Sequence, residues 1–398
     1  MVAKVMHVLF LYPRTLDSSR SVGGVAEFLC ALTPALKSLG VNPIIYAGDK
    51  TLSQIIKPSQ IIADATIYNG PFIKPGFFVS KRKLIPILEL CRQTKIDVIH
   101  AQGTYTAGFM ALQLYKNAKI PYVVTSHSDI LITNSKRINR GNVQRRCRQV
   151  LKYASAVTHL TSMMEDVSHQ LWDTREKSTT IGNGIDCDSW RAYSRLPEKN
   201  YILGIGRLER GKGFHVLIAM YAELIQRGVT TSLIIAGKGT EEKNLLSQAQ
   251  QLGLKVVTDF NDFSHIPEQS VIFTGYVRNE AKMRLIAQSQ FVLFATQPDL
   301  WEEAFGIVQL EAMAAGKPMI ASDTNATRLL HQAGLQVRIV EPSNVSAWAD
   351  HAVLLLNNAD LRKQLGVANL QAVMQFDWQP IAKQYWDVYA KICKFPYV

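Results

Sequence analysis

The chain has 398 residues, of which 47% are hydrophobic and 19% are charged. These proportions exclude an intrinsically disordered protein, and the length predicts two domains, because single hydrophobic cores rarely grow beyond about 250–300 residues. The formal net charge is +12, and all of the excess lies in residues 1–195, which hold 25 Lys and Arg against 13 Asp and Glu. This asymmetry indicates an anionic partner for the N-terminal half.

The N-terminus, MVAKVMHVLFLYP, passes directly into a strand-like pattern without the features of a signal peptide. No uncharged apolar run reaches the roughly 18 residues that a membrane-spanning helix needs. The five cysteines lie far apart and lack the spacing of metal ligands. We therefore expect a cytoplasmic protein without a zinc site.

Short apolar runs alternate with helical stretches along the whole chain. In the first half, strands are predicted at residues 5–12, 42–48, 96–101 and 121–127, and helices at 25–40 and 108–118. In the second half, strands are predicted at 201–207, 231–239, 271–275, 290–296 and 318–322, and helices at 214–228, 242–253, 280–289 and 305–316. Strands that are apolar throughout and separated by helices are typical of parallel sheets covered on both faces. The sequence thus predicts an α/β protein with two doubly wound, Rossmann-like domains.

A polar stretch near residues 188–200 separates the two series of elements. We place the N-terminal domain at residues 1–195 and the C-terminal domain at 196–375, and we expect residues 376–398 to form a helix that returns to the N-terminal domain. Ligands bind beyond the carboxyl ends of parallel strands, so a cleft between the domains is the expected site.

Two features of the first half follow predicted strands. Gly23 and Gly24 precede a helix and could let the backbone approach an anionic ligand, although such glycines are as often a plain turn. His127 ends another strand, where its imidazole could donate a hydrogen bond to a sugar hydroxyl or to a developing charge. A histidine bonded to nearby backbone is the alternative interpretation.

In the second half, YILGIGRLERGKGFHVL places Arg207 and Lys212 between a strand and a helix, among several glycines. Two cations beside a helix N-terminus favour a diphosphate. The spacing differs from both the dinucleotide fingerprint and the phosphate-binding loop ending in Gly-Lys-Ser/Thr. A surface charge pair is the alternative.

The run EEAFGIVQLE holds two glutamates, Glu303 and Glu311, around the start of a helix that we expect near Phe305 and that Gly316 ends. If helical throughout, the eight-residue spacing would separate them by about 12 Å. The carboxyl groups of glycoside hydrolases lie roughly 5–9.5 Å apart. The two glutamates therefore suit the hydroxyl groups at the two ends of a nucleotide sugar better than an acid/base pair.

Asp186 and Asp188 form an Asp-x-Asp sequence, by which some sugar transferases bind a divalent metal. Their position after Asn183 and Gly184 more simply predicts a turn and a helix start.

Together these motifs resemble the retaining glycosyltransferases of the GT-B fold, specifically glycosyltransferase family four. The resemblance rests on the E-x7-E motif in EAFGIVQLEAMAAGKP, on GRLERGKG, and on AGKG, FTGYV, IGNGID and GGVAEF, in the family's order and over nearly the whole chain. It implies transfer of a hexose from a UDP- or GDP-sugar with retention of configuration and without a metal or other cofactor.

The resemblance also implies roles for individual residues. Arg207 and Lys212 would bind the diphosphate and stabilise the departing nucleotide, and His127 would contact the sugar near the reaction centre. Glu303 would hold the sugar and Glu311 the ribose. The other residues implied at the donor are Gly23, Gly24, Gly237, Val277, Phe305, Gly306, Ile307 and Val308.

The stretch between Asp129 and Glu165 contains no acidic residue. From Val143 onward, apolar residues recur on one helical face, which indicates a basic amphipathic helix. We expect this surface to meet a lipid-linked or anionic acceptor, or the inner face of a membrane, with a solvated helix face as the alternative. The cluster lacks the interleaved aromatics of a nucleic-acid site. Its members are Lys136, Arg137, Arg140, Arg145, Arg146, Arg148 and Lys152.

Two other functions remain open at the level of sequence. The chain could be a non-catalytic partner subunit that keeps the fold, or a nucleotide-sugar epimerase or phosphorylase on a similar two-domain fold. The residues of the E-x7-E motif, with Arg207 and Lys212, favour the transferase.

Overall fold

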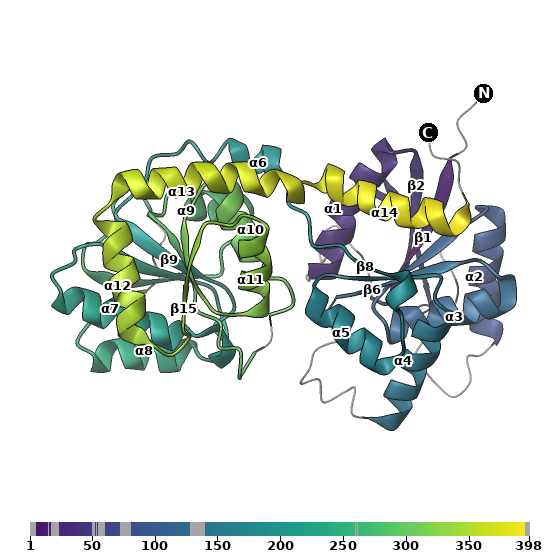
Figure 1. The fold of residues 1–398 in the computed structure, drawn as a ribbon, viewed down its shortest axis with the longest axis horizontal. Coiled ribbons are helices and arrows are strands. Elements are labelled where there is room, and N and C mark those ends of the chain that lie inside the picture. Colours follow the sequence, from purple (N-terminus) through teal and green to yellow (C-terminus); the bar gives the residue numbers. More distant parts are fainter. Residues whose placement is uncertain are drawn as a thin grey trace. The chain divides into compact units, whose positions relative to one another are not determined.

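A computed structural model gives the structure of the chain. It describes residues 5–14, 16, 24–49, 52, 54, 60–71, 81–127, 140–258, 260, 262–301 and 303–394. The chain forms two compact units (Figure 1), one made of Met1–Gly184 with Phe376–Val398 and the other of Ile185–Gln375. The division thus follows Gly184, whereas the sequence placed it after residue 195. The reason is helix α6 (Cys187–Arg191), which packs against the second unit, where the Cys187 thiol donates a hydrogen bond to the Val373 carbonyl at 3.7 Å.

The first unit is built on an eight-stranded sheet of order β3-β4-β2-β1-β5-β6-β7-β8, in which only β3 runs antiparallel to its described neighbour. Its strands are β1 (Met6–Tyr12), β2 (Val41–Asp49), β3 (Gln60–Ile62), β4 (Ala65–Pro71), β5 (Val98–Gln102), β6 (Tyr122–Ser126), β7 (Ala156–His159) and β8 (Ser178–Thr180). Its helices are α1 (Gly24–Ser38), α2 (Lys81–Gln93), α3 (Thr106–Ala118), α4 (Gly141–Tyr153), α5 (Ser162–Leu171), the 3₁₀ turn η1 (Arg175–Lys177) and α14 (Trp378–Cys393).

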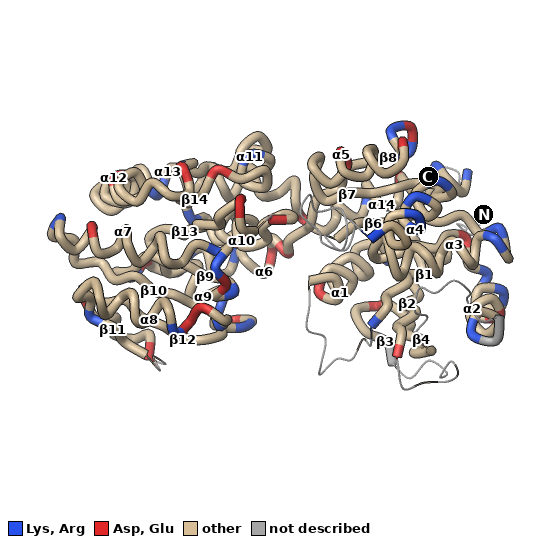
Figure 2. The backbone as a smooth tube through the Cα atoms, turned by 90° about the horizontal axis from the view of Figure 1, so that it is seen from below, with Lys and Arg blue, Asp and Glu red and all other residues tan. Residues whose placement is uncertain are grey.

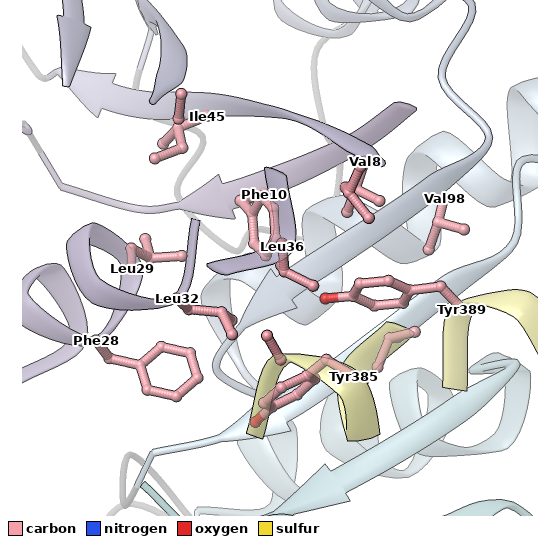
Figure 3. Packing of buried hydrophobic residues seen from close by; sticks show 14 of the residues in the cluster. Val8, Phe10, Phe28, Leu29, Leu32, Leu36, Ile45, Val98, Tyr385 and Tyr389 are labelled. Atoms are coloured by element: carbon pink, nitrogen blue, oxygen red, sulfur yellow. The ribbon is translucent and has the colours of Figure 1, made fainter. Parts of the chain in front are cut away.

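Helix α14 completes the core of the first unit. It packs beside α1, and Figure 3 shows Tyr385 and Tyr389 among side chains of α1 and β1 such as Phe28, Leu32 and Phe10. The Tyr389 hydroxyl lies 2.6 Å from Nδ1 of His100, a fully buried residue of β5. A polar contact of this kind fixes the helix on the sheet, because an unpaired buried imidazole would be costly.

The second unit is built on a seven-stranded parallel sheet of order β11-β12-β10-β9-β13-β14-β15. Its strands are β9 (Tyr201–Ile205), β10 (Ser232–Ala236), β11 (Lys255–Val257), β12 (Ser270–Gly275), β13 (Val292–Phe294), β14 (Met319–Ser322) and β15 (Val337–Val340). After α6, its helices are η2 (Arg210–Lys212), α7 (Phe214–Gln226), α8 (Glu242–Gln251), α9 (Asn279–Ala287), α10 (Ile307–Ala314), α11 (Asn325–Gln332), α12 (Val345–Leu356), α13 (Ala359–Ala372) and η3 (Val373–Phe376).

The predicted α/β class and doubly wound sheets are confirmed, and each predicted strand and helix is present. The helix expected near Phe305 begins instead at Ile307. Gly306 causes the delay, because it caps the helix with a φ of +75°, in the left-handed region that glycine adopts without steric cost. Gly316, with a φ of +67°, ends the helix as predicted.

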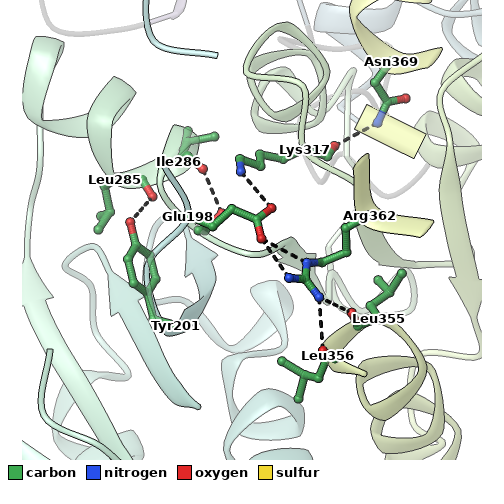
Figure 4. Close-up of polar contacts among 10 residues, drawn as sticks. Glu198, Tyr201, Leu285, Ile286, Lys317, Leu355, Leu356, Arg362 and Asn369 are labelled. Atoms are coloured by element: carbon green, nitrogen blue, oxygen red, sulfur yellow. Dashed lines mark hydrogen bonds and ion pairs between the residues drawn. The ribbon is translucent and has the colours of Figure 1, made fainter. Parts of the chain in front are cut away.

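An ionic cluster of one exposed glutamate and two buried cations holds the start of the second unit in place (Figure 4). The Glu198 carboxylate accepts hydrogen bonds from the Lys317 ammonium at 3.2 Å and from the Arg362 guanidinium at 2.8 Å. Arg362 also donates to the Leu355 and Leu356 carbonyls at the end of α12. Burial lowers the pKa of Lys317 below its usual value, and the charge of Glu198 offsets only part of this shift. The cluster thus ties the segment before β9 to α12 and α13.

Within the described ranges, no helix has the length and apolar character needed to cross a membrane.

Candidate functional site

The centre of the second sheet is a topological switch point. Strands β9 and β13 are neighbours, and the chain leaves them towards opposite edges of the sheet. In open α/β sheets, ligands bind beyond the carboxyl ends of such a strand pair. The loops that follow the two strands meet there. The backbone amide of Gln297 donates a hydrogen bond to the Gly211 carbonyl at 2.8 Å. The predicted Arg207, Lys212 and Glu303 all lie in these two loops.

Trp301 brings the two cations together. Its ring centroid lies 4.7 Å from the Arg207 guanidinium carbon and 5.3 Å from Lys212 Nζ, so both side chains make cation–π contacts with it. Gly211 packs so closely on the Trp301 side chain that a methyl group there would collide with it. Trp301 was not predicted, because a single aromatic residue in a loop carries no pattern. The result is a cationic face beside the N-terminus of α7, suited to a diphosphate.

Lys212 and Glu303 form an ion pair across the two loops. Each side chain keeps only 15% of its exposure, so water screens this pair less than a surface pair. The lysine was predicted to bind the diphosphate and the glutamate to hold the sugar, and the ion pair places these two side chains in contact. A donor whose diphosphate and sugar adjoin would meet both groups together.

Glu311 is paired with a different lysine. Its carboxylate, in a side chain of a residue only 7% exposed, binds the Lys282 ammonium of α9. Lys282 was missed, since no pattern within α9 marks it. Because Glu303 and Glu311 are each neutralised by a separate cation, they do not form a carboxylate pair that shares a proton. The arrangement is that of two separate anchors, one on either side of the start of α10.

The turn between the glutamates is shaped for close backbone approach. Phe305 is 2% exposed and anchors the turn, whereas Ile307 is 43% exposed. A Cβ on Gly306 would lie 2.6 Å from Nε2 of the buried Gln309. The backbone amides of Ile307 and Val308, the first of α10, therefore follow a position that has room only for glycine.

Gly237 and Val277 follow the neighbouring strands β10 and β12. Gly237 has a φ of +153° and donates its amide to the Gly275 carbonyl at 2.8 Å, and a Cβ at this position would collide with the Gly206 carbonyl. Val277 is half-buried, two residues beyond Gly275. The structure therefore places both predicted residues at the same sheet edge as Arg207 and Lys212.

In the first unit, His127 follows β6 and is half-buried. Its Nε2 lies 2.7 Å from Oε1 of Gln102, the last residue of β5, and its ring meets that of Phe28 edge-on at 4.7 Å between centroids. Burial lowers its pKa to about 4, so the ring is neutral near pH 7. Nearby backbone was the alternative partner predicted for His127, but its partner among the described residues is the side chain of Gln102.

The predicted glycines after β1 are only partly described. Gly24 is the exposed first residue of α1, and Gly23 lies outside the described residues.

The predicted basic helix is α4, which begins at Gly141 and buries Val143, Cys147, Val150 and Leu151. Figure 2 colours the Lys and Arg positions along the backbone blue. The exposed cations of α4 and its N-cap are Arg140, Arg145, Arg148 and Lys152. Lys136 and Arg137 lie outside the described residues.

Arg146 does not lie on the predicted basic face of α4. It is half-buried and turned towards α3, where its guanidinium donates a hydrogen bond to the Tyr105 hydroxyl at 3.2 Å and lies 5.4 Å from the centre of the Phe109 ring. The prediction that it lies on the exposed face was therefore wrong. Its position one turn from both Val143 and Val150 places it at the border of the apolar stripe.

Two exposed aromatic residues flank the end of α4. Tyr153 is 42% exposed and Trp172 is 37% exposed, and Lys152 Nζ lies 5.6 Å and 5.2 Å from their ring centroids.

The Asp-x-Asp sequence forms a helix cap. The Asp186 carboxylate accepts a hydrogen bond from the Ser189 amide at 2.9 Å and so caps α6, and Asp188 lies 3.6 Å from Arg191. The predicted helix start is confirmed. Among the residues that the structure describes, no group of three or more His, Cys, Asp or Glu side chains could hold a metal ion.

Two family models match successive parts of the chain. The model described as "Glycosyltransferase Family 4" matches residues 22–189, and the model described as "Glycosyl transferases group 1" matches residues 188–371. Together they include both sheets almost completely.

Individual proteins agree with these matches. The chain is 32% identical to a phosphatidyl-myo-inositol mannosyltransferase of Mycobacterium leprae over 53% of each chain, so it matches about half the length of that relative. It is 25% identical to an uncharacterised glycosyltransferase of Methanocaldococcus jannaschii over 97% of each chain. The solved structure of Anabaena HepE in complex with UDP superposes with a TM-score of 0.73 at 20% identity, covering 97% of this chain and 100% of that one. The chain belongs to glycosyltransferase family four and has the GT-B fold.

Proposed function

We propose that the protein transfers a hexose from a UDP- or GDP-sugar to an acceptor with retention of anomeric configuration. The observation that carries this proposal is the contact between Lys212 and Glu303, with Arg207 held beside them on Trp301. Cations for a diphosphate and a carboxylate for sugar hydroxyls adjoin at the carboxyl edge of one sheet. Such a site recognises both charged and hydroxylated parts of one ligand.

The proposed roles follow from this arrangement. Arg207 and Lys212 bind the diphosphate and stabilise the negative charge that develops on the departing nucleotide, which is the step where electrostatic stabilisation contributes most. Glu303 accepts hydrogen bonds from the transferred sugar, together with the amides that begin α10. Glu311 accepts them from the ribose, and Gly237 and Val277 line the base pocket. The cationic residues replace a metal ion, so the reaction needs none.

We propose a lipid-linked or anionic glycan precursor as the acceptor, in the synthesis of cell-envelope glycoconjugates. The support is the exposed cationic side of α4 and the name of the mycobacterial relative, a mannosyltransferase that acts on a phosphatidyl-inositol. In this proposal the protein works in the cytoplasm and contacts the inner face of the membrane peripherally through α4. Nucleic acid is not an expected partner.

Thermal-shift measurements with a panel of nucleotide sugars test the donor. A ligand that binds only the folded protein raises its apparent stability, by about 2.7 kcal/mol when its concentration is 100 times its Kd. One UDP- or GDP-sugar should stabilise the wild-type protein and fail to stabilise Lys212→Ala. If neither nucleotide nor any of its sugars shifts the unfolding of the wild type, the donor proposal is wrong.

A non-catalytic partner subunit with the same fold is the rival function. Slow hydrolysis of the bound donor distinguishes the transferase from the partner subunit. It is measured for the wild type and for Lys212→Ala. Turnover by the wild type that the variant lacks supports the transferase, and its absence from both proteins supports the partner subunit.

A further inference from the structure

Gln102 and His127 extend from adjacent strands of the first sheet. Gln102 ends β5 and pairs with Thr125 of β6, and His127 follows two residues after Thr125. This register brings the two side chains to the same edge, where Gln102 Oε1 lies 2.7 Å from His127 Nε2. Gln102 is 4% exposed, so its carboxamide cannot easily exchange this contact for water.

The chemistry of the pair determines which group donates. With its carboxamide oxygen towards the ring, Gln102 accepts the hydrogen bond, and His127 Nε2 then carries the hydrogen. A neutral imidazole has one N–H, which leaves Nδ1 unprotonated and able to accept. The hydrogen bond that the sequence assigned to a sugar hydroxyl is therefore already made with Gln102.

The surroundings of the pair limit its movement. The edge of the Phe28 ring lies against the His127 ring, with the two planes at 70°. His100, also on β5, has its Nε2 2.5 Å from the Thr125 hydroxyl. Since these contacts come from α1, β5 and β6, the imidazole is held by well-packed elements.

We propose that Gln102 is a positioning residue that keeps the proton of His127 on Nε2, so that Nδ1 accepts a hydrogen bond from a hydroxyl of the acceptor. His127 then orients a hydroxyl by accepting its hydrogen, and does not donate to a developing charge. This inference rests on the proposed transferase function only for its kinetic consequence. The tautomer itself is a property of the protein alone.

Nuclear magnetic resonance of the ¹⁵N-labelled full chain measures the tautomer without any reaction. His127 is one of nine histidines, and its signals are identified as those that disappear in His127→Gln. We expect a protonated Nε2 and an unprotonated Nδ1 in the wild type. In Gln102→Leu, which keeps the size but removes the acceptor, the two shifts should move towards each other as both tautomers become populated. Gln102→Glu, which keeps an acceptor oxygen, should retain a protonated Nε2.

Either of two spectra would overturn the proposal: a wild-type ring protonated on Nδ1, or an unchanged tautomer in Gln102→Leu. Thermal unfolding of each variant verifies that the spectra come from folded protein. Gln113→Leu, a substitution on α3 of the same unit, is the matched control and should leave the His127 signals unchanged.

The kinetic arm uses the same variants with the donor found by thermal shift. We expect kcat/KM to fall about tenfold in Gln102→Leu, the effect of one lost hydrogen bond, and to stay closer to wild type in Gln102→Glu. Equal losses in the two variants would contradict a positioning role. If the wild type shows the expected tautomer but no turnover, the transferase proposal fails while the assignment of Gln102 stands.

Discussion

Lys212 and Glu303 form an ion pair although 91 residues separate them in the sequence. The pair joins the loop after β9 to the loop after β13. In the proposed complex the diphosphate competes with Glu303 for the lysine, while the sugar supplies hydroxyl groups to the glutamate. Before the donor arrives, each side chain of the pair thus holds the other in place and compensates its charge.

Substitution of either partner should impair donor binding. Lys212→Ala removes a phosphate ligand and leaves the Glu303 carboxylate, 15% exposed, without its cation. We expect kcat/KM to fall by a factor that corresponds to about 3 kcal/mol of lost transition-state stabilisation for Lys212→Ala. For Glu303→Gln, which keeps one acceptor oxygen, we expect about 1.5 kcal/mol. Isothermal titration with the donor and steady-state kinetics measure both.

Lys243→Ala on α8 is the control for these two variants, because Lys243 is exposed and lies outside the proposed site. The donor assignment would be wrong if Lys212→Ala bound the nucleotide sugar as tightly as Lys243→Ala.

Trp301 should affect donor affinity without touching the chemistry. Its ring holds Arg207 and Lys212 by cation–π contacts, each contributing about 0.5–1 kcal/mol or more. We expect Trp301→Ala to weaken donor binding about tenfold, and Trp301→Phe, which keeps an aromatic face, to weaken it less. Gly211→Ala should resemble Trp301→Ala, since the added methyl group displaces the ring. A Trp301→Ala variant with wild-type donor affinity would show that the cations need no such support.

The residues of the site that could be predicted are those whose position is marked by a local sequence pattern. Arg207 and Lys212 lie between a strand and a helix, and Glu303 and Glu311 flank a helix start, so sequence spacing alone placed them at a strand edge. Trp301 could not be found in this way. Its function depends on a contact with residues of another loop, about a hundred positions away, and no pattern within its own loop reports that contact.

The fold was predictable for a related reason. Apolar strands alternating with helices specify parallel sheets, and the predicted elements recur in both units. The domain boundary was less accurate, because α6 is short and polar in sequence and only the packing of Cys187 and Trp190, both buried, assigns it to the second unit. Arg146 was misplaced since it lies at the border of the apolar stripe, where periodicity does not decide between the two faces.

The Glu198 cluster should control the stability of the second unit. Removing its carboxylate leaves Lys317, 7% exposed, and Arg362, 9% exposed, as uncompensated buried cations. We expect Glu198→Ala to lower the free energy of unfolding by about 3 kcal/mol, measured by urea denaturation. Glu280→Ala, which breaks an exposed pair with Arg284 on α9, should cost less than about 1 kcal/mol. Equal effects of the two substitutions would contradict the dependence of the two buried cations on the Glu198 charge.

Acid should destabilise the first unit through three histidines. Burial lowers the pKa of His100 and His159 to about 3 and that of His127 to about 4, from 6.5. The unfolded chain therefore binds more protons than the folded one as the pH falls through 6.5. The stability is fully present above that pH and is lost below it, by up to about 1.4 kcal/mol per histidine and pH unit. Urea midpoints across this range should fall with pH, and less steeply in His100→Gln. Midpoints that stay constant below pH 6.5 would contradict the direction of these pKa shifts.

Contact with anionic lipid should depend on the exposed side of α4. Arg145, Arg148 and Lys152 project from it, and the aromatic rings of Tyr153 and Trp172 lie beside Lys152. Each basic residue near an anionic surface contributes about 1 kcal/mol, so replacing all three by Gln should weaken binding to phosphatidylserine vesicles about 100-fold. Flotation with these vesicles at physiological salt measures the change.

Three exposed lysines of the second unit, Lys243, Lys255 and Lys363, provide the matched control for this experiment. Their replacement by Gln lowers the net charge equally, so it separates a local effect of α4 from a general effect of charge. Binding that falls equally in both triple variants would show that only the net charge matters, and a wild-type protein that stays unbound would exclude the membrane contact. Loss confined to the α4 variant is the expected result, because its three cations lie on the proposed contact surface, whereas the three control lysines do not.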